Sequence, residues 1–152
     1  MEGSKTYQER YAKVFAALQR GDYALLRDLR AKEIRSQKSL VSFLDECLDR
    51  YGCTKAFIIK KTNASKSLIY KVFEGEKKLV DRNLAIRIAL AMRMGVDNAQ
   101  ALLRLAGLPE LSADNLRDGI LMMCLDKAES IIRADEWLEG GGLEGLFGMD
   151  VK

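Results

Sequence analysis

The sequence lacks several residues and patterns that common classes of functional site require. None of its 152 residues is a histidine, which excludes a Cys/His zinc site and any catalysis that depends on a histidine base. The three cysteines, Cys47, Cys53 and Cys124, are odd in number and include no CxxC pair. We therefore expect reduced thiols that pack as small apolar side chains, with no metal site and no cofactor.

Proline and long apolar runs are scarce as well. Pro109 is the only proline, and clusters of β-branched residues are few, which argues against an all-β fold. No apolar run approaches the roughly 18 to 20 residues that a membrane span needs. The first fifteen residues also lack the basic and apolar regions of a secretory signal. We expect a cytoplasmic protein without membrane contact.

Charge is distributed unevenly along the chain, although the formal net charge is only +3. Residues 55–78 contain seven lysines and two glutamates, which gives a local charge of +5. Residues 109–152 contain ten acidic and four basic residues, which gives a local charge of −6. This pattern predicts an anionic partner for the basic centre, while the acidic end faces elsewhere or screens the basic face.

Apolar residues recur at helical spacing along nearly the whole chain, so we expect an all-α fold. The predicted helices cover residues 6–20, 22–34, 39–51, 54–62, 66–73, 82–93, 98–106, 113–127 and 130–139. We divide the chain into an N-terminal helical extension (1–36), a central domain (39–108), a C-terminal helical extension (109–139) and a glycine-rich tail (140–152).

Three local expectations accompany this division. The polar run 35–38 is predicted to be a joint between helices, and Asp97 with Gln100 matches a capping box. Five glycines between residues 140 and 148 predict a mobile tail, because neither a preceding strand nor a GK[ST] sequence supports a phosphate loop. Four large side chains are expected in the core: Met94, Met122, Met123 and Trp137.

Residues 54–75 fit a helix-turn-helix, in which two short helices pack across a tight turn. Asn63 stands where the turn needs a residue that tolerates positive φ. Ser65 can cap the second helix, and Gly75 can end it. The residues expected to pack the two helices together are Ile58, Ile59, Thr62, Ile69, Val72 and Phe73.

The run TKAFIIKKTNASKSLIYKVFEGEKKL (54–79) resembles the helix-turn-helix of the phage-repressor-like transcriptional regulators, the family of lambda repressor, Cro and Xre. The matching positions are Thr54, Ile58, Ser65, Ile69, Val72 and Gly75. Residues 81–107 resemble the fourth and fifth helices of that domain, and residues 41 to about 146 resemble a bacterial subgroup with an extra C-terminal helical unit. The chain departs from the family at Ile59, normally a small alanine, and at Phe73, normally an acidic residue.

The resemblance implies a sequence-specific DNA-binding transcriptional regulator that places residues 66–73, as its recognition helix, in the major groove of double-stranded DNA. It implies base contacts by Lys66, Ser67, Lys71, Leu68 and Tyr70. It implies phosphate contacts by Lys55, Lys77 and Lys78. Because one such domain reads only a few base pairs, a homodimer is expected.

Other readings of the same residues stay open. A protein-interaction module, antitoxin-like or an adaptor, would use the acidic region 109–152 or the N-terminal helices, and Ile59 and Phe73 favour it. The helix over residues 6–20 has a broad apolar face that could pair two monomers or cover the core. An enzyme is not expected, because the remaining carboxylates and lysines form no catalytic motif.

Overall fold

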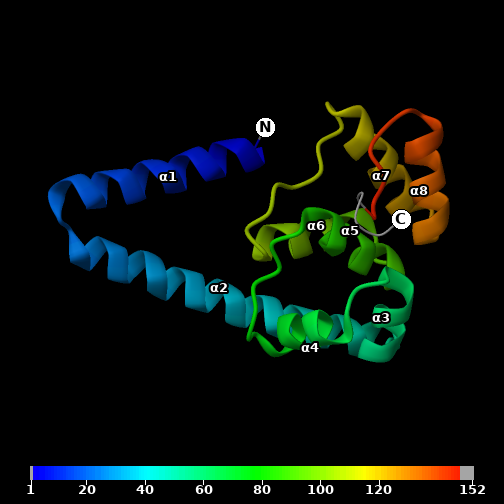
Figure 1. Ribbon diagram of the computed structural model, residues 1–152, viewed down its shortest axis with the longest axis horizontal. Helices are drawn as coiled ribbons and strands as arrows, with labels where there is room; N and C mark the ends of the chain where they lie inside the picture. The colour runs from blue at the N-terminus through cyan, green and yellow to red at the C-terminus, as the bar shows by residue number, and fades with distance from the viewer. Residues whose placement is uncertain (1, 148–152) are drawn as a thin grey trace.

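The computed structural model describes residues 2–147, and its helices are drawn in chain order in Figure 1. The described range contains eight helices and no strand, which confirms the all-α prediction. The helices are α1 (Glu2–Arg20), α2 (Tyr23–Arg50), α3 (Lys55–Thr62), α4 (Lys66–Glu74), α5 (Arg82–Ala91), α6 (Val96–Leu105), α7 (Leu116–Asp126) and α8 (Ile131–Gly140). Within that range, no helix combines the length and the apolar character needed to cross a membrane.

α1 and α2 form a helical hairpin whose closed end lies away from the other helices (Figure 1). Gly21 has a φ of +64° and makes the turn between them, a conformation that glycine adopts without strain. The Asp22 carboxylate accepts a hydrogen bond from the Leu25 amide at 3.0 Å and thereby caps α2. We call residues 2–38, which are α1 and the first part of α2, the arm.

α2 runs for 28 residues through the run 35–38 without a break, so the predicted joint is wrong. Arginine, glutamine and lysine in that run are good helix formers. Gln37 also makes a tertiary contact, because its side-chain amide donates to the Gly75 carbonyl at 2.6 Å. The predicted boundary between residues 36 and 39 thus falls inside one helix, and the division into domains stays a prediction.

The core of the molecule surrounds α5, in which residues 84–91 are all buried. α3 and α6 pack against α5, and α2 packs against α4 and α6. Beyond the arm, α2 contributes Leu40, Leu44 and Cys47 to this core. The α3–α4 pair therefore rests on α2 and α5 rather than standing alone.

α7 and α8 pack against each other and against α5, and the segment after α8 folds back onto the core. Leu146 in that segment is completely buried. Its amide donates to the Asp135 carboxylate of α8 at 2.7 Å. The mobile tail predicted from the glycines is therefore wrong for residues 140–147, while residues 148–152 lie outside the described range.

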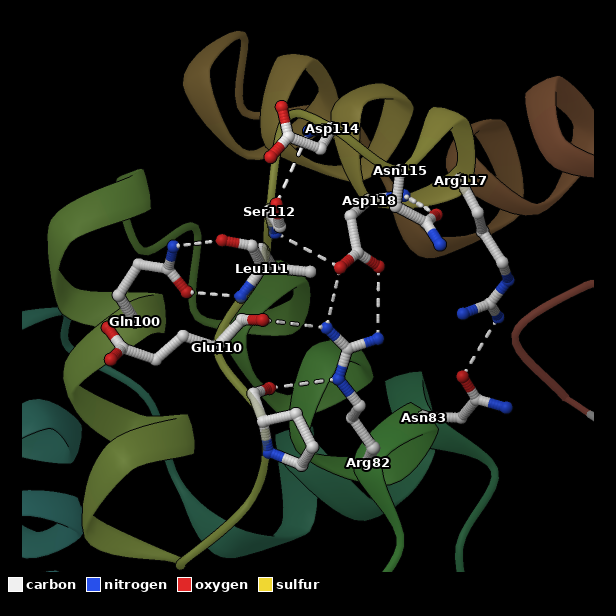
Figure 2. A network of polar contacts seen from close by, with 11 residues as sticks. Arg82, Asn83, Gln100, Glu110, Leu111, Ser112, Asp114, Asn115, Arg117 and Asp118 are labelled. Carbon is white, nitrogen blue, oxygen red and sulfur yellow. Dashed lines mark hydrogen bonds and ion pairs between the residues drawn. The ribbon is translucent and has the colours of Figure 1, made fainter. Parts of the chain in front are cut away.

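Arg117 of α7 also binds the backbone of the segment that follows α8. Its guanidinium donates to the carbonyl oxygens of Glu144 and Gly145 at 2.9 and 3.0 Å. It also donates to the Asn83 side chain of α5 at 2.9 Å, a contact drawn in Figure 2. The backbone of the final segment is thus tied both to α7 and, through Arg117, to α5.

Arg82 joins α5 to the connection before α7 and to α7 itself (Figure 2). Its guanidinium donates two hydrogen bonds to the buried Asp118 carboxylate, at 3.0 and 2.8 Å. Two further bonds reach the carbonyl oxygens of Pro109 and Glu110, at 2.9 and 3.1 Å. Asp118 also accepts from the Ser112 amide at 3.1 Å. One arginine thereby fastens the start of the C-terminal unit onto the central helices.

The predicted capping box at Asp97 is also wrong. α6 begins at Val96, and its N-cap is Gly95, which makes no side-chain capping bond. Gln100 instead bonds twice with the backbone of Leu111, accepting from the amide at 2.7 Å and donating to the carbonyl at 2.8 Å. A long-range contact has replaced the local one that the sequence pattern suggested.

The four large side chains expected in the core have different environments. Met94 is fully buried, and Met122 is partly buried against the core. Met123 and Trp137 are more than half exposed, at 54% and 52%, so the prediction is wrong for these two. They lie on the outward surfaces of α7 and α8.

Candidate nucleic-acid interface

Residues 54–75 form two short helices, α3 and α4, which are joined by a tight turn. Asn63 adopts the left-handed conformation, with φ 58° and ψ 25°, and so makes the turn. The Ser65 hydroxyl accepts from the Leu68 amide at 3.1 Å and caps α4. Gly75, with φ 80°, ends α4 in the left-handed conformation that favours glycine. All three local assignments are confirmed.

The packing between α3 and α4 follows most of the predicted register. Ile58 and Thr62 of α3 are fully buried, as are Ile69, Val72 and Phe73 of α4. The Thr62 hydroxyl donates to the Ile58 carbonyl at 2.7 Å, which satisfies the one polar group in this set. Ile59 is only partly buried and packs against the core.

Arg87 of α5 stabilises the turn between α3 and α4, a contact that was not predicted from the sequence. It is 6% exposed, and its guanidinium donates to the Thr62 carbonyl, the last residue of α3, at 2.9 Å. The guanidinium carbon also lies 5.0 Å from the centroid of the Phe147 ring. Burial lowers the pKa of Arg87, although an arginine side chain stays protonated in proteins. A charged residue within the apolar run LAIRIALA was the only sequence signal for this contact.

The outward face of α4 carries the predicted base-reading residues. Lys66, Ser67 and Lys71 are exposed, and among the described side chains neither lysine forms an ion pair. Leu68 is partly buried and packs against the core, so less of it is free for an outside partner. α4 therefore presents a polar, basic surface opposite its buried side.

The Tyr70 ring lies close to two other predicted DNA-contact residues, Lys55 and Lys66. The ammonium nitrogen of Lys55 lies 5.2 Å from the centroid of its ring, and that of Lys66 lies 5.8 Å away. Both distances are within the range of a cation–π attraction. The ring thus holds one cation from the start of α3 beside one from the start of α4. We call Lys55, Lys66 and Tyr70 the Tyr70 cluster.

The loop after α4 contains the other predicted phosphate contacts. Lys77 is exposed, whereas Lys78 forms an ion pair with Glu33 of the arm. Both partners are about half exposed, at 55% and 41% of their side chains. With the Gln37–Gly75 hydrogen bond, this pair makes two links between α2 and the loop. A DNA phosphate would compete with Glu33 for Lys78, but not for Lys77.

A cavity of about 270 Å³ lies where the arm meets the body of the molecule. Its lining includes Glu33, Gln37, Lys78 and Arg104 together with Leu79 and Val80. The charged residues at this cavity include the Glu33–Lys78 pair. No catalytic constellation is present among its lining residues.

The thiols and carboxylates of the described residues offer little other chemistry. Burial raises the pKa of both Cys47 and Cys124, so these thiols stay protonated at neutral pH and react slowly. Cys53 is less buried, and burial raises its pKa too. Within residues 2–147, no group of three or more cysteine or carboxylate side chains could hold a metal ion.

The geometry leaves one coherent candidate site. Exposed lysines surround an α3–α4 pair whose turn, cap and buried register are all in place. Three further contacts with this pair or its loop were not predicted from the sequence. They are hydrogen bonds or ion pairs made by residues in distant parts of the chain, Arg87, Glu33 and Gln37. Comparison of the chain with protein-family models, with curated proteins and with solved structures finds no match.

Proposed function

We propose that the protein binds double-stranded DNA in a sequence-specific manner and acts as a transcriptional regulator, with α4 as its recognition helix. The proposal rests on one combination of features: two short helices packed across a left-handed turn, and a basic, exposed outer face on the second of them, α4. A helix of this kind fits the major groove with its N-terminal part toward the base edges. The basic stretch 55–78 supplies the field that attracts a polyanion.

The residues divide into two roles under this proposal. Lys66, Ser67 and Lys71 face the base edges, where lysine donates to guanine and serine to any base. Lys55, Lys77 and Lys78 face phosphates, which position the protein without reading sequence. Leu68 and Tyr70 are partly buried, so they have less surface free for a base contact.

Two alanine substitutions test this division. Lys71→Ala should cost about 1–3 kcal/mol on the preferred sequence and relax discrimination at one position. Lys78→Ala should weaken all duplexes alike and make the salt slope shallower by about one unit. Fluorescence anisotropy with a selected site and a scrambled duplex measures both effects. If Lys71→Ala weakened the two duplexes equally, α4 would not read bases through that residue.

Substitutions of Tyr70 test whether its ring or its hydroxyl matters. In Tyr70→Leu, both ammonium groups lose the ring that orders them, which should weaken binding at least about 5-fold, because each lysine side chain is then ordered only on binding at a cost of about 0.5 kcal/mol or more. In Tyr70→Phe the ring remains, and affinity should stay within about twofold of wild type. Equal losses in both variants, measured by anisotropy, would point instead to a base contact by the hydroxyl.

A second function is favoured by the apolar side chains on the C-terminal unit. Leu116 and Met123 of α7 and Ile132 and Trp137 of α8 are exposed within an acidic part of the chain. Such residues suit a protein-interaction module, antitoxin-like or an adaptor. Two results together would favour this function over the first. The wild-type protein would not bind DNA, and a complex with a protein partner would still form in the Lys66→Glu/Lys71→Glu variant.

A further inference from the structure

One face of α1 is apolar and uncovered in the single chain. Tyr11, Phe15 and Leu18 recur at spacings of four and three residues, which places them on the same side of the helix. They are 61%, 50% and 66% exposed. The Tyr11 and Phe15 rings are stacked with their centroids 6.1 Å apart, so they form one continuous apolar surface.

Few of the described side chains of the arm are buried. Of the described side chains between residues 9 and 39, only Ala17 is fully buried. Tyr23, at the start of α2, is 70% exposed, and Ile34 is 44% exposed. Helices in water derive most of their stability from packing an apolar face against another element. Among the described side chains of the arm, other apolar residues such as Val14, Leu25 and Leu29 are only partly buried, and a further helical layer would complete their packing.

The exposed area is a substantial part of what a specific interface needs. A buried aromatic side chain removes about 150–250 Å² from water, so the exposed parts of Tyr11 and Phe15 amount to roughly 170–280 Å². A standard interface buries about 800 Å² on each partner, of which roughly 500 Å² is apolar. The two rings therefore supply about a third to a half of that apolar area, and Leu18 on the same face adds to it.

The arm is also coupled mechanically to the α3–α4 pair. α2 passes from the arm into the core without a break and packs against α4. Gln37 and Glu33 bond to Gly75 and Lys78, in the loop that follows α4. The arm is thus linked to α4 and to the loop after it, and a contact between two arms would bring two α4 helices into one assembly.

We propose that the arm is a dimerisation element, in which the Tyr11–Phe15–Leu18 face of α1 packs on the same face of a second copy of the chain. The two hairpins then form a four-helix bundle from which the two α3–α4 pairs extend. Two α3–α4 pairs joined in this way would read two adjacent half-sites on DNA. The pairing stands on the arm alone, whereas the reading of two half-sites rests on the proposed DNA binding.

Electrostatics separates this contact from DNA binding. Residues 1–38 contain nine basic and five acidic residues, so each arm carries a net charge of +4. Two arms therefore repel each other, and salt screens that repulsion without weakening the apolar contact. Self-association should strengthen as salt rises, whereas binding to DNA weakens.

The test is sedimentation-velocity analysis of the full chain across a range of concentrations and at two ionic strengths. Wild type should dimerise, with a lower dissociation constant at the higher salt concentration. Phe15→Glu/Leu18→Glu places two charges from each chain, four in all, in the contact and should raise the dissociation constant at least about 100-fold. Leu116→Glu is the matched control, because Leu116 is 69% exposed on α7, outside the arm, and should leave the dimer intact.

A wild-type chain that stays monomeric at tens of micromolar, or a Phe15→Glu/Leu18→Glu variant that dimerises like wild type, would overturn the proposal. Circular dichroism of each variant establishes that α1 remains helical. Binding of the monomeric variant to random duplex at low salt separates the two proposals. If the variant is monomeric and still binds duplex, both proposals stand, whereas a wild-type dimer that binds no duplex retains the arm contact and loses the DNA-binding function.

Discussion

Arg82→Ala should lower the free energy of unfolding by about 3–5 kcal/mol, because it leaves the buried Asp118 carboxylate without its cation. The substitution also removes the donors that bind the carbonyl oxygens of Pro109 and Glu110. Urea denaturation followed by circular dichroism measures the change. The loss should be largest in the part of the transition that involves α7 and α8, since Arg82 fastens that unit to α5.

Arg133→Ala is the matched control for this prediction. Arg133 pairs with Glu136 on the same helix, three residues away, and both side chains are more than half exposed. Such a surface pair contributes about 0–1 kcal/mol, so this variant should stay close to wild type. If Arg82→Ala cost no more than Arg133→Ala, the network in Figure 2 would not be what holds the C-terminal unit in place.

Leu146→Ala should destabilise the protein by about 2–5 kcal/mol, because it opens a cavity at a completely buried position. The prediction separates a docked segment from a mobile one. A leucine in a mobile tail would contribute almost nothing to the free energy of unfolding.

Leu116→Ala provides the control on an exposed leucine, and its effect should stay within about 0.5 kcal/mol. Equal midpoints for Leu146→Ala and wild type in urea would show that residues 141–147 do not pack on the core. Hydrogen exchange at the Leu146 amide gives an independent measure, since this amide donates to Asp135 and should be protected.

The features predicted correctly from sequence depend on short-range chemistry. The backbone at the helix ends is one example. Asn63 and Gly75 tolerate the left-handed conformation that ends α3 and α4, and the Ser65 hydroxyl caps the first turn of α4. The apolar register of α3 and α4 follows from helical periodicity alone. These features position the candidate site, and they required no knowledge of the rest of the chain.

The errors arose where a distant contact outweighed a local pattern. The run 35–38 looked like a joint, yet Gln37 binds the Gly75 carbonyl 38 residues away. The glycines after residue 140 suggested mobility, yet Leu146 is part of the core, and Leu143 and Phe147 pack against it. Gln100 matched a capping box but bonds to Leu111 instead.

For the arrangement of the helices beyond α3 and α4, the sequence predicted the fold class but not the contacts. An all-α fold was predictable from periodicity, and the structure confirms it. The likeness to phage-repressor-like regulators rests on residues 54–79 and on the order of helices that follow, and it remains a proposal. The links from Arg87, Glu33 and Gln37 to the α3–α4 pair could not be predicted, because each joins segments without a shared sequence pattern.

The central claim is that the basic face of α4 binds DNA. A mobility-shift series with the DNA upstream of the protein's own gene, at several salt concentrations, tests it most directly. With about four to six phosphate contacts in each monomer, the logarithm of the affinity should fall with the logarithm of salt concentration at a slope of about −4 to −5 per monomer. Lys66→Glu/Lys71→Glu should abolish the shift. No detectable binding to any duplex at low salt, or an unchanged shift in the double variant, would contradict the account.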